Sequence, residues 1–391
     1  MVRGLFCHYL PICKDINGVY CSTTMTDTFF ARYFCVVDEL IVATRVYQID
    51  TTYQEAHQEK ISLNSVRIVE FPNLSTIRGV LFEMKNAEKR LYEEAQKCDL
   101  YFLRGGLIAL LGRKVIKRLK RPFLVESAGC AWDEYWNYSL SGKLLAPYME
   151  FMAKKMTKEA SHVVYVTEKW LQERYPTKGI STHASNVMLQ NVEISALEGR
   201  IKKIGEYEAE KKRFVIGTTG GIGNRAKGQH FVIQAMNMLQ DEYDIVYELV
   251  GGGDSEFLRK ICKKYNITDR VVFRGQLTHE EVLDWIKTLD LYIQPSMQEG
   301  LPRALIEAMS QACPAIGSST GGIPELLDEK AIFKRGSVGD LAKVFRNILK
   351  DDLTIYAKMN FNKAKDYELG SISKRREDLY KKYRDFVIGR N

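Results

Sequence analysis

Two glutamates, Glu299 and Glu307, have the residue type and the spacing to hold the hydroxyls of a sugar and a ribose. Glu299 lies in a loop after a strand pattern, and Gly300 allows the backbone to turn tightly behind it. Pro302 suits the first position of a helix, where its missing N–H is no loss. The free N–H groups and the dipole of that helix end form an anion site. Glu307 lies about five residues into the helix, roughly 7.5 Å along its axis, which is about the reach from a diphosphate to its ribose.

The same two glutamates also allow a purely structural interpretation. Glu307 lies four residues after Arg303, so the two side chains can form an exposed helix pair worth roughly a few tenths of a kcal/mol. Glu299 can be a solvated loop charge. Two carboxylates that flank an anion site nevertheless suit a nucleotide-sugar, and the surrounding residues favour that interpretation.

From Asp290 to Leu326 the chain resembles the C-terminal signature of the family 4 retaining glycosyltransferases, which have the GT-B fold. The matching run from position 290 is Asp-Leu-Tyr-Ile-Gln-Pro-Ser-Met-Gln-Glu-Gly-Leu-Pro-Arg-Ala-Leu-Ile-Glu-Ala-Met-Ser, followed by Pro-Ala-Ile from 314 and Gly-Gly-Ile-Pro-Glu from 321. The resemblance implies that Glu299 is catalytic and binds the donor together with Gly300, Leu301 and Glu307. A weaker resemblance covers most of residues 160–350, and the chain departs from the family at Ala312–Cys313, where glycine is usual.

The resemblance further implies an α/β protein in which two Rossmann-like domains carry parallel sheets that face one another across a cleft. It implies transfer of a hexose-type sugar from a nucleotide diphosphate donor to an acceptor hydroxyl. The anomeric configuration would be retained by same-face attack within a tight ion pair. A UDP-sugar is the favoured donor, and the acceptor is a glycan or a lipid-linked saccharide.

A glycine-rich loop follows the predicted strand at 213–217. Its run Gly-Ile-Gly-Asn-Arg-Ala from Gly221 fits the loose dinucleotide-binding pattern, which leaves a dehydrogenase as an alternative. Arg225 and Lys227 instead suit a diphosphate, because fixed cations neutralise phosphate charge. In the resembling family an arginine and a lysine of this loop hold the donor diphosphate. Lys227 matches the lysine, the family arginine lies nearer to Gly221, and solvated loop charges are the structural alternative.

Two further loops follow predicted strands. Gly252 lies in a run of three glycines after the strand at 246–250, and Arg274 follows the strand at 271–273. Parallel α/β sheets bind ligands at the carboxyl ends of their strands. The resemblance places the nucleobase near these two loops, and ordinary turn chemistry is an equally good explanation of the glycines.

The first half of the chain resembles the family less. Gly18 occupies the place of the family's glycine loop, which implies contact with the donor phosphates. Glu126, at the end of the predicted strand at 122–126, is a second catalytic candidate, since many relatives place a histidine or a carboxylate there. Trp132 can stack on a sugar ring, and Asp133 is a further carboxylate. A capping carboxylate beside a core tryptophan explains these residues equally well.

Composition limits the partners and the compartment. The chain has 57 Lys and Arg against 49 Asp and Glu, a net charge of +8, which favours acidic partners such as nucleotides and diphosphates. No nucleic-acid motif and no Asp-x-Asp cluster is present, so neither nucleic acid nor a metal cofactor is expected. The eight cysteines lack metal-ligand spacing and indicate reduced thiols. No signal peptide and no apolar run of about 18 residues is found, so a cytoplasmic protein is predicted.

The segment Arg113–Arg121 contains six Lys and Arg residues and no acid, alternating with apolar residues at helical spacing. Such a basic helix is typical of a membrane-surface element. The sequence therefore predicts peripheral binding to an anionic membrane surface on its inner face, with an ordinary solvated helix face as the alternative.

Short apolar runs alternate with amphipathic stretches, which predicts parallel sheets covered by helices. Strands are predicted at 4–9, 40–46, 66–71, 100–103, 122–126 and 162–166, and again at 213–217, 246–250, 271–273, 291–294 and 315–317. The predicted domains are 1–195 on the acceptor side, a charged linker at 196–212, a donor-binding domain at 213–368, and a C-terminal helix at 369–391 that packs back on the first domain. The alternatives to a glycosyltransferase are a nucleotide-sugar epimerase or phosphorylase, or a catalytically silent nucleotide-sugar-binding subunit.

Overall fold

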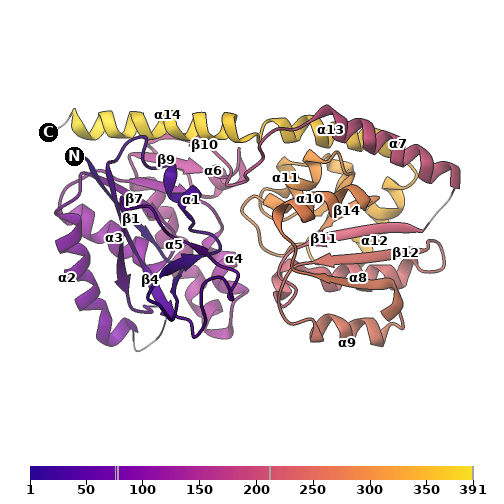
Figure 1. The fold of residues 1–391 in the computed structure, drawn as a ribbon, viewed down its shortest axis with the longest axis horizontal. Coiled ribbons are helices and arrows are strands. Elements are labelled where there is room, and N and C mark those ends of the chain that lie inside the picture. Colours follow the sequence, from indigo (N-terminus) through magenta and orange to yellow (C-terminus); the bar gives the residue numbers. More distant parts are fainter. Residues whose placement is uncertain (75, 77–78, 211–212, 390–391) are drawn as a thin grey trace. The chain divides into compact units, whose positions relative to one another are not determined.

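The computed structural model describes residues 1–74, 76, 79–210 and 213–389. The chain forms two compact units. The first comprises Met1–Val166, Leu171–Ala184 and Ser373–Asn391, and the second comprises Thr167–Trp170 and Ser185–Ile372. Each unit is an α/β domain with its own sheet and with helices packed around it (Figure 1).

The first unit is built on a ten-stranded sheet with the order β10-β9-β8-β7-β1-β4-β2-β3-β5, in which β6 pairs with β4. The strands are β1 (Arg3–His8), β2 (Ile12–Lys14), β3 (Tyr20–Ser22), β4 (Glu39–Gln48), β5 (Glu59–Lys60), β6 (Val66–Phe71), β7 (Leu100–Arg104), β8 (Leu124–Ser127), β9 (His162–Tyr165) and β10 (Ile180–His183). The central strands pair in parallel, whereas β3 pairs antiparallel with β2 and β5. The central strands are almost wholly apolar because helices cover such a sheet on both faces.

The helices of the first unit connect these strands. They are α1 (Asp27–Ala31), α2 (Met84–Ala95), which follows a π-helical turn at Gly79–Glu83, α3 (Gly106–Arg118), α4 (Ala131–Trp136), α5 (Leu140–Glu159) and α6 (Trp170–Arg174), whose first residue belongs to the second unit, and α14 (Leu369–Ile388), which enters the first unit at Ser373.

The second unit is built on a six-stranded sheet of parallel pairs with the order β13-β12-β11-β14-β15-β16. The strands are β11 (Phe214–Thr219), β12 (Ile245–Val250), β13 (Val271–Gly275), β14 (Leu291–Gln294), β15 (Ala315–Ser318) and β16 (Ile332–Phe333). The helices are α7 (Ile194–Glu210), α8 (Gln229–Leu239), α9 (Glu256–Lys264), α10 (His279–Thr288), α11 (Arg303–Ser310), α12 (Val338–Ile348) and α13 (Leu353–Lys365), with 3-10 turns at Arg225–Lys227, Thr268–Arg270, Ile323–Glu325 and Glu329–Ala331.

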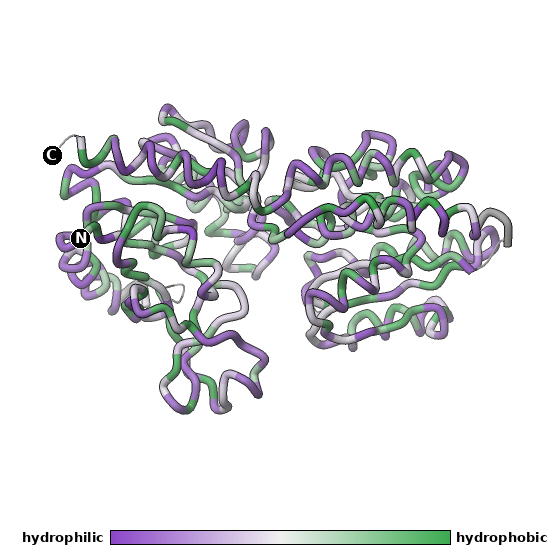
Figure 2. Tube along the Cα trace, turned by 45° about the horizontal axis from the view of Figure 1, so that its top comes forward, coloured by the Kyte–Doolittle hydropathy of each residue, from purple (hydrophilic) through white to green (hydrophobic). Residues whose placement is uncertain are grey.

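The hydropathy pattern explains this architecture. Along the chain trace, hydrophobic and hydrophilic residues alternate within the helices (Figure 2), as expected of helices with one buried side. Each strand predicted from the sequence is present, with ends that differ by no more than two residues. The predicted α/β fold of two Rossmann-like domains with parallel sheets is therefore confirmed.

The charged stretch at 196–212 differs from the predicted linker. Through Glu210 it is part of α7, a helix of the second unit, and residues 211–212 lie outside the described residues. The guanidinium of Arg200, only 3% exposed, donates a hydrogen bond of 2.9 Å to the carbonyl of Ile286 and a second one to that of Leu289. The Arg200 guanidinium thus satisfies two backbone carbonyls at the end of α10. Helix α7, which contains Arg200, is therefore an integral part of the second unit.

The C-terminal helix α14 completes the core of the first unit. Tyr380 and Tyr383 are fully buried, and the Tyr380 ring stacks on Tyr33 with 5.6 Å between centroids. The backbone N–H of Tyr101 donates to the Tyr383 hydroxyl at 3.0 Å. Residues from the two ends of the chain therefore share one hydrophobic core.

Candidate functional site

Glu299 lies in the loop between β14 and α11, and polar side chains hold one of its carboxylate oxygens. Lys227 Nζ donates to Glu299 Oε1 at 2.7 Å, and the Ser296 hydroxyl donates to it at 2.8 Å. The Gln294 amide lies 3.3 Å from the same oxygen. Within the described part of the chain, Oε2 accepts no hydrogen bond. The loop thus presents a carboxylate that is fixed by a cation and has one oxygen free for a hydroxyl.

Two backbone constraints place Lys227 beside Glu299. Gly228 has φ +75°, and a Cβ on it would lie 2.0 Å from the carbonyl oxygen of Pro295. The N–H of Met297 donates to the carbonyl of Ala226 at 2.7 Å. Since β11 and β14 are neighbours in the sheet, the loops at their carboxyl ends meet at the same edge, as in other parallel α/β sheets.

Glu307 is a nearly buried carboxylate without a strong cationic partner. Its side chain is 16% exposed, and its Oε1 lies 3.8 Å from His279 Nδ1. Burial raises the pKa of the Glu307 carboxyl, and the charges of His279 and Arg303 only partly offset that effect. No ion pair within 4.0 Å joins Glu307 to Arg303 in the described structure, so the helix pair that the sequence allowed is not formed. A buried polar group without a partner is typical of a ligand site.

The second part of the signature fixes the loop that contains Gly300 and Leu301. The N–H of Gly322 donates to the carbonyl of Gly300 at 2.7 Å. A Cβ on Gly321, where φ is +58°, would lie 2.3 Å from the carbonyl oxygen of Glu299. Leu301, the residue after Gly300, is buried, with an exposed fraction of 8%. Two glycines, rather than side chains, therefore determine the position of the Glu299 loop.

The predicted glycines Gly221 and Gly252 lie in adjoining loops at the ends of β11 and β12. The N–H of Ile222 donates to the carbonyl of Gly252 at 2.9 Å. A Cβ on Gly251 would lie 2.2 Å from the carbonyl oxygen of Gly220, so close backbone packing explains this glycine. Gly221 itself is exposed, and a Cβ there would meet only Asn224, at 3.8 Å.

Arg225 does not lie with Lys227. Its exposed guanidinium lies 4.1 Å from the ring centroid of Phe257 on α9, a cation–π contact. Of the two cations predicted to hold the diphosphate, Lys227 is thus the one that contacts Glu299. Contact of Arg225 with phosphate remains a prediction.

Arg274, predicted to lie near the nucleobase, stabilises a buried carboxylate. Its guanidinium donates to both oxygens of Glu248, at 2.6 and 3.1 Å. Glu248 is 6% exposed and also accepts from the Trp285 indole at 2.6 Å. A bidentate pair of this kind satisfies a charge that is costly to bury alone. The sequence reasoning missed this structural role because Glu248 reads as part of an apolar strand.

Glu325, the last residue of the matched signature, has a structural role that the motif alone did not reveal. Its carboxylate accepts hydrogen bonds from three successive backbone N–H groups, those of Glu168 (2.7 Å), Lys169 (3.1 Å) and Trp170 (2.5 Å). Free N–H groups at the start of a helix attract a carboxylate in this way. Glu325 therefore fixes residues 168–170 within the second unit.

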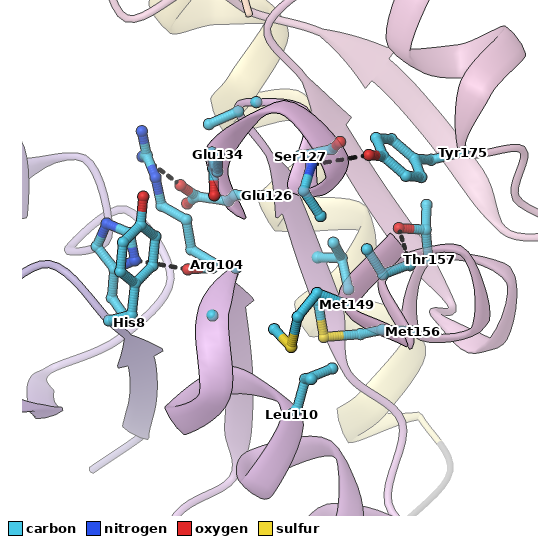
Figure 3. A pocket seen from close by; sticks show the side chains of 18 of the residues that line it. His8, Arg104, Leu110, Glu126, Ser127, Glu134, Met149, Met156, Thr157 and Tyr175 are labelled. Atoms are coloured by element: carbon cyan, nitrogen blue, oxygen red, sulfur yellow. Dashed lines mark hydrogen bonds and ion pairs between the residues drawn. The ribbon is translucent and has the colours of Figure 1, made fainter. Parts of the chain in front are cut away.

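In the first unit, structural partners hold both carboxylate oxygens of Glu126, and Figure 3 shows one of these partners, Arg104. Arg104 donates to its Oε2 at 2.9 Å, Tyr33 donates to Oε1 at 2.7 Å, and the Tyr380 hydroxyl donates to Oε1 as well. Burial alone would raise the pKa of Glu126, but Arg104, Arg32 and the tyrosine hydroxyls lower it to about 2. A carboxylate with that pKa is a poor proton acceptor. The geometry therefore gives Glu126 a structural role in the core, and its catalytic role stays a prediction.

Next to Glu126 lies a cavity of about 240 Å³ that the sequence reasoning did not find. Leu110, Met149 and Met156 line its apolar side, and Arg104 and Glu134 line its polar side (Figure 3). Burial raises the pKa of Glu134 to about 7, although Tyr9 and Arg104 act in the opposite direction. A carboxyl group that is half-protonated near neutral pH can donate or accept a proton from a bound hydroxyl.

The other candidates in the first unit have local explanations. Asp133 is buried, and Trp132 stacks on Trp136 with 5.2 Å between ring centroids. Gly18, predicted to contact phosphates, lies in an exposed turn between β2 and β3 with φ +79°. Its N–H donates to the carbonyl of Asp15 at 2.9 Å. The turn conformation itself requires this glycine.

The predicted membrane-binding segment Arg113–Arg121 is partly neutralised by acids from other elements. Arg113, 7% exposed, and Lys117 both bind Glu159, at 2.6 and 2.9 Å. Lys114 binds Glu88 at 2.6 Å. The sequence pattern did not reveal these acids, because they lie on neighbouring helices.

The described residues contain no group of three or more His, Cys, Asp or Glu side chains that could hold a metal ion. Among them, no helix has the length and apolarity to span a bilayer.

Comparisons with known proteins connect this geometry to a family. Residues 200–366 match the family model described as glycosyl transferases group 1. Protein CapJ of Staphylococcus aureus is 28% identical over 98% of this chain and 96% of its own length. A putative teichuronic acid biosynthesis glycosyltransferase, TuaC of Bacillus subtilis, is 24% identical over 65% of this chain and 60% of its own length. The crystal structure of Anabaena HepE in complex with UDP matches all of both chains with a TM-score of 0.62 at 16% identity, which shows the shared fold.

Fold, loop geometry and family match together define a transferase of the GT-B type. Residues 200–366 carry the group 1 glycosyltransferase match, and this matched region contains Lys227, Glu299 and Glu307.

Proposed function

We propose that the protein is a retaining glycosyltransferase that transfers a hexose-type sugar from a UDP-sugar to an acceptor hydroxyl in the synthesis of a polysaccharide or other glycan. The sugar C1–O bond to the diphosphate breaks, the C1–O bond to the acceptor forms on the same face, and the acceptor proton leaves with the UDP.

The observation that carries this proposal is the ion pair of 2.7 Å between Lys227 and Glu299. It places the Lys227 ammonium where the loops after β11 and β14 meet, with the Glu299 carboxylate beside it. The donor diphosphate displaces Glu299 as the partner of Lys227, because a dianionic group attracts an ammonium more strongly than one carboxylate does. Glu299 is then free to accept hydrogen bonds from the sugar.

Glu307 supports the same arrangement. Its side chain is only 16% exposed, this burial raises its pKa, and ribose hydroxyls would supply the hydrogen bonds that it lacks. The start of α11, four residues before it, offers backbone N–H groups to a phosphate.

The choice of UDP and of a glycan acceptor rests on similarity. HepE binds UDP according to its crystal structure, and the name of TuaC specifies teichuronic acid biosynthesis. A lipid-linked acceptor fits such a pathway step as well as a free glycan end. No metal cofactor is proposed, because Lys227 and the helix start can neutralise the diphosphate.

The decisive experiment follows UDP release from UDP-glucose, UDP-galactose and UDP-N-acetylglucosamine, with GDP- and ADP-sugars as controls and an oligosaccharide acceptor panel. Acceptor-dependent release of UDP, insensitive to chelator, supports the proposal. Conversion of the donor without an acceptor indicates an epimerase, and binding without turnover in every arm indicates a silent binding subunit. Loss of all turnover in chelator overturns the metal-free part.

Replacement of the lysine tests the same site. K227A should weaken binding of UDP far more than binding of uridine, because only UDP carries the phosphates. R225A, measured in parallel, tests whether the second cation of the same loop also contacts the phosphates. Equal losses for UDP and uridine in K227A would assign the lysine to the fold.

A further inference from the structure

Large apolar side chains are exposed on α4, on α5 and in the turn between them. Figure 1 shows where these two helices lie in the first unit. The group, called here the outer face, is between 39% and 87% exposed and consists of Trp136, Tyr138, Leu140, Leu144, Tyr148 and Phe151. Exposed apolar residues are ordinary when scattered singly, but a contiguous group marks an interaction surface.

Helical spacing brings these residues together. Leu140, Leu144, Tyr148 and Phe151 recur at intervals of three or four, so they share one side of α5. The opposite side is buried and packs on the unit through residues that include Ala146, Met149 and Met156. The exposed stripe is roughly 16 Å long at 1.5 Å per residue. Because the opposite side of α5 packs on the unit, the stripe lies along the surface of the unit.

The charges around this stripe are basic. Lys143, Lys154, Lys155 and Lys158 are exposed on the same helix, and Lys143 Nζ lies 5.6 Å from the centroid of the Trp136 ring. The two acids of α5 are held by arginines: Glu150 by Arg174 at 3.0 Å and Glu159 by Arg113 at 2.6 Å. The outer face therefore combines leucine and aromatic side chains with lysines.

We propose that the outer face docks in the headgroup region of an anionic lipid bilayer, with α5 parallel to the membrane plane. Amphipathic helices at a membrane surface have this composition, with Leu, Phe and Trp in the acyl boundary and lysines at the phosphates. Tyr and Trp prefer the same interfacial zone. The ammonium groups of lysines reach the headgroups while their alkyl stems cover apolar surface. A two-fold contact between copies of this chain fits worse, because it would bring these lysines together.

The test is co-sedimentation of the full chain with phosphatidylcholine vesicles that contain or lack phosphatidylglycerol. The double variant L144S/F151S removes two residues of the outer face. The matched control is I355S/M359S, which changes two exposed apolar residues on one side of α13 of the second unit, with exposures of 52% and 42%. We expect binding to anionic vesicles, a loss of about tenfold or more in affinity for L144S/F151S, and no change for the control.

A second readout is independent of sedimentation. Trp136 fluorescence should shift to the blue and be quenched by lipids brominated in the acyl chain, and the W136F variant should lose that quenching. The double variant K143Q/K155Q should weaken binding to anionic vesicles and leave the weak binding to neutral vesicles unchanged.

Four outcomes overturn the proposal. These are the absence of wild-type binding to anionic vesicles, full binding by L144S/F151S, an equal loss in the I355S/M359S control, and a wild-type dimer that L144S/F151S dissociates without any vesicle binding. If K117Q/K120Q alone loses vesicle binding, the membrane-binding element is the basic segment Arg113–Arg121 and not the outer face. Transferase activity toward a water-soluble acceptor should persist in L144S/F151S, so this test is separate from that of the catalytic site.

Discussion

Lys227 and Glu299 form an ion pair, and the exchange of this pair for a bound diphosphate is what we propose at the scale of single residues. Their side chains are 29% and 11% exposed, so solvent reaches the lysine more readily than the carboxylate. The ion pair keeps the lysine ordered in the absence of a ligand. It also keeps Glu299 at the place where the sugar is proposed to bind.

Glu307→Ala should weaken UDP binding by about 1.5–3 kcal/mol, roughly tenfold to a hundredfold, because a charge-assisted hydrogen bond to the ribose is lost. Isothermal titration calorimetry with UDP measures the effect. Arg303→Ala is the control, since Arg303 lies on the same helix and forms no ion pair with Glu307 in the described structure. Unchanged UDP affinity in a folded Glu307→Ala variant would contradict ribose binding.

Glu134 should make the first unit less stable as the pH rises. Its folded-state pKa of about 7 lies above its ordinary value of 4.5, so folding favours the neutral carboxyl. That stabilisation is fully present below pH 4.5 and is lost as the pH rises through 7, an effect of roughly 3 kcal/mol by linkage. Urea unfolding of wild type and Glu134→Gln across this range measures it. The difference between the two proteins should change with pH, and a constant difference would refute the shifted pKa.

At the scale of elements, strand ends and tight turns determine where the chemistry lies. The carboxyl ends of β11 and β14 bring Lys227 and Glu299 together, although 71 residues separate the two in sequence. Ala312 ends α11 with φ +51°, a conformation that favours glycine. This accounts for the glycine that relatives usually have in this position.

Gly228→Ala should disrupt the donor loop. Alanine at φ +75° is strained, and its Cβ would lie 2.0 Å from the carbonyl oxygen of Pro295, so we expect a loss of about 1–3 kcal/mol in stability together with weaker UDP binding. Gly221→Ala is the matched control, because its Cβ would meet nothing closer than 3.8 Å. Thermal unfolding and UDP titration of both variants test this, and equal behaviour of the two would show that the loop tolerates movement.

At the scale of the whole molecule, the chain divides into units that are not continuous in sequence. The first unit needs the last residues of the chain, since Tyr380 lies against Tyr33 and donates to Glu126. The residues proposed to bind the donor all lie in the second unit. The stability of one unit and the nucleotide affinity of the other should therefore be separable.

Tyr380→Ala should destabilise the first unit by about 3–5 kcal/mol, because it leaves a cavity in a buried aromatic cluster and removes a donor from Glu126. Tyr380→Phe, which removes only the hydroxyl, should cost less. UDP affinity should remain near that of the wild type in both. Chemical unfolding followed by UDP titration gives the two quantities, and a collapse of UDP binding in Tyr380→Phe would show that the units are coupled.

The sequence by itself determined the α/β class, the strands that we predicted in the two sheets, and the glycosyltransferase signature. These signals are local: apolar runs of strand length, helical periodicity, and a signature within which Glu299 and Glu307 are close in sequence. The same local reasoning assigned residues 196–212 to a linker, whereas through Glu210 they belong to α7 of the second unit. It did not reveal the buried partners of Glu126 and Arg274, and the catalytic and nucleobase-binding roles of these two residues stay predictions.

Only the tertiary structure decided the roles that depend on partners distant in sequence. Glu126 forms an ion pair with Arg104 and accepts hydrogen bonds from Tyr33 and Tyr380, and Arg274 forms an ion pair with Glu248. The cavity beside Glu134 and the exposed outer face of α5 were equally invisible, because burial and exposure depend on which elements pack together. A residue's type fixes what it can do, but its charge state and its neighbours, and therefore its function, follow from the packing that the folded chain imposes.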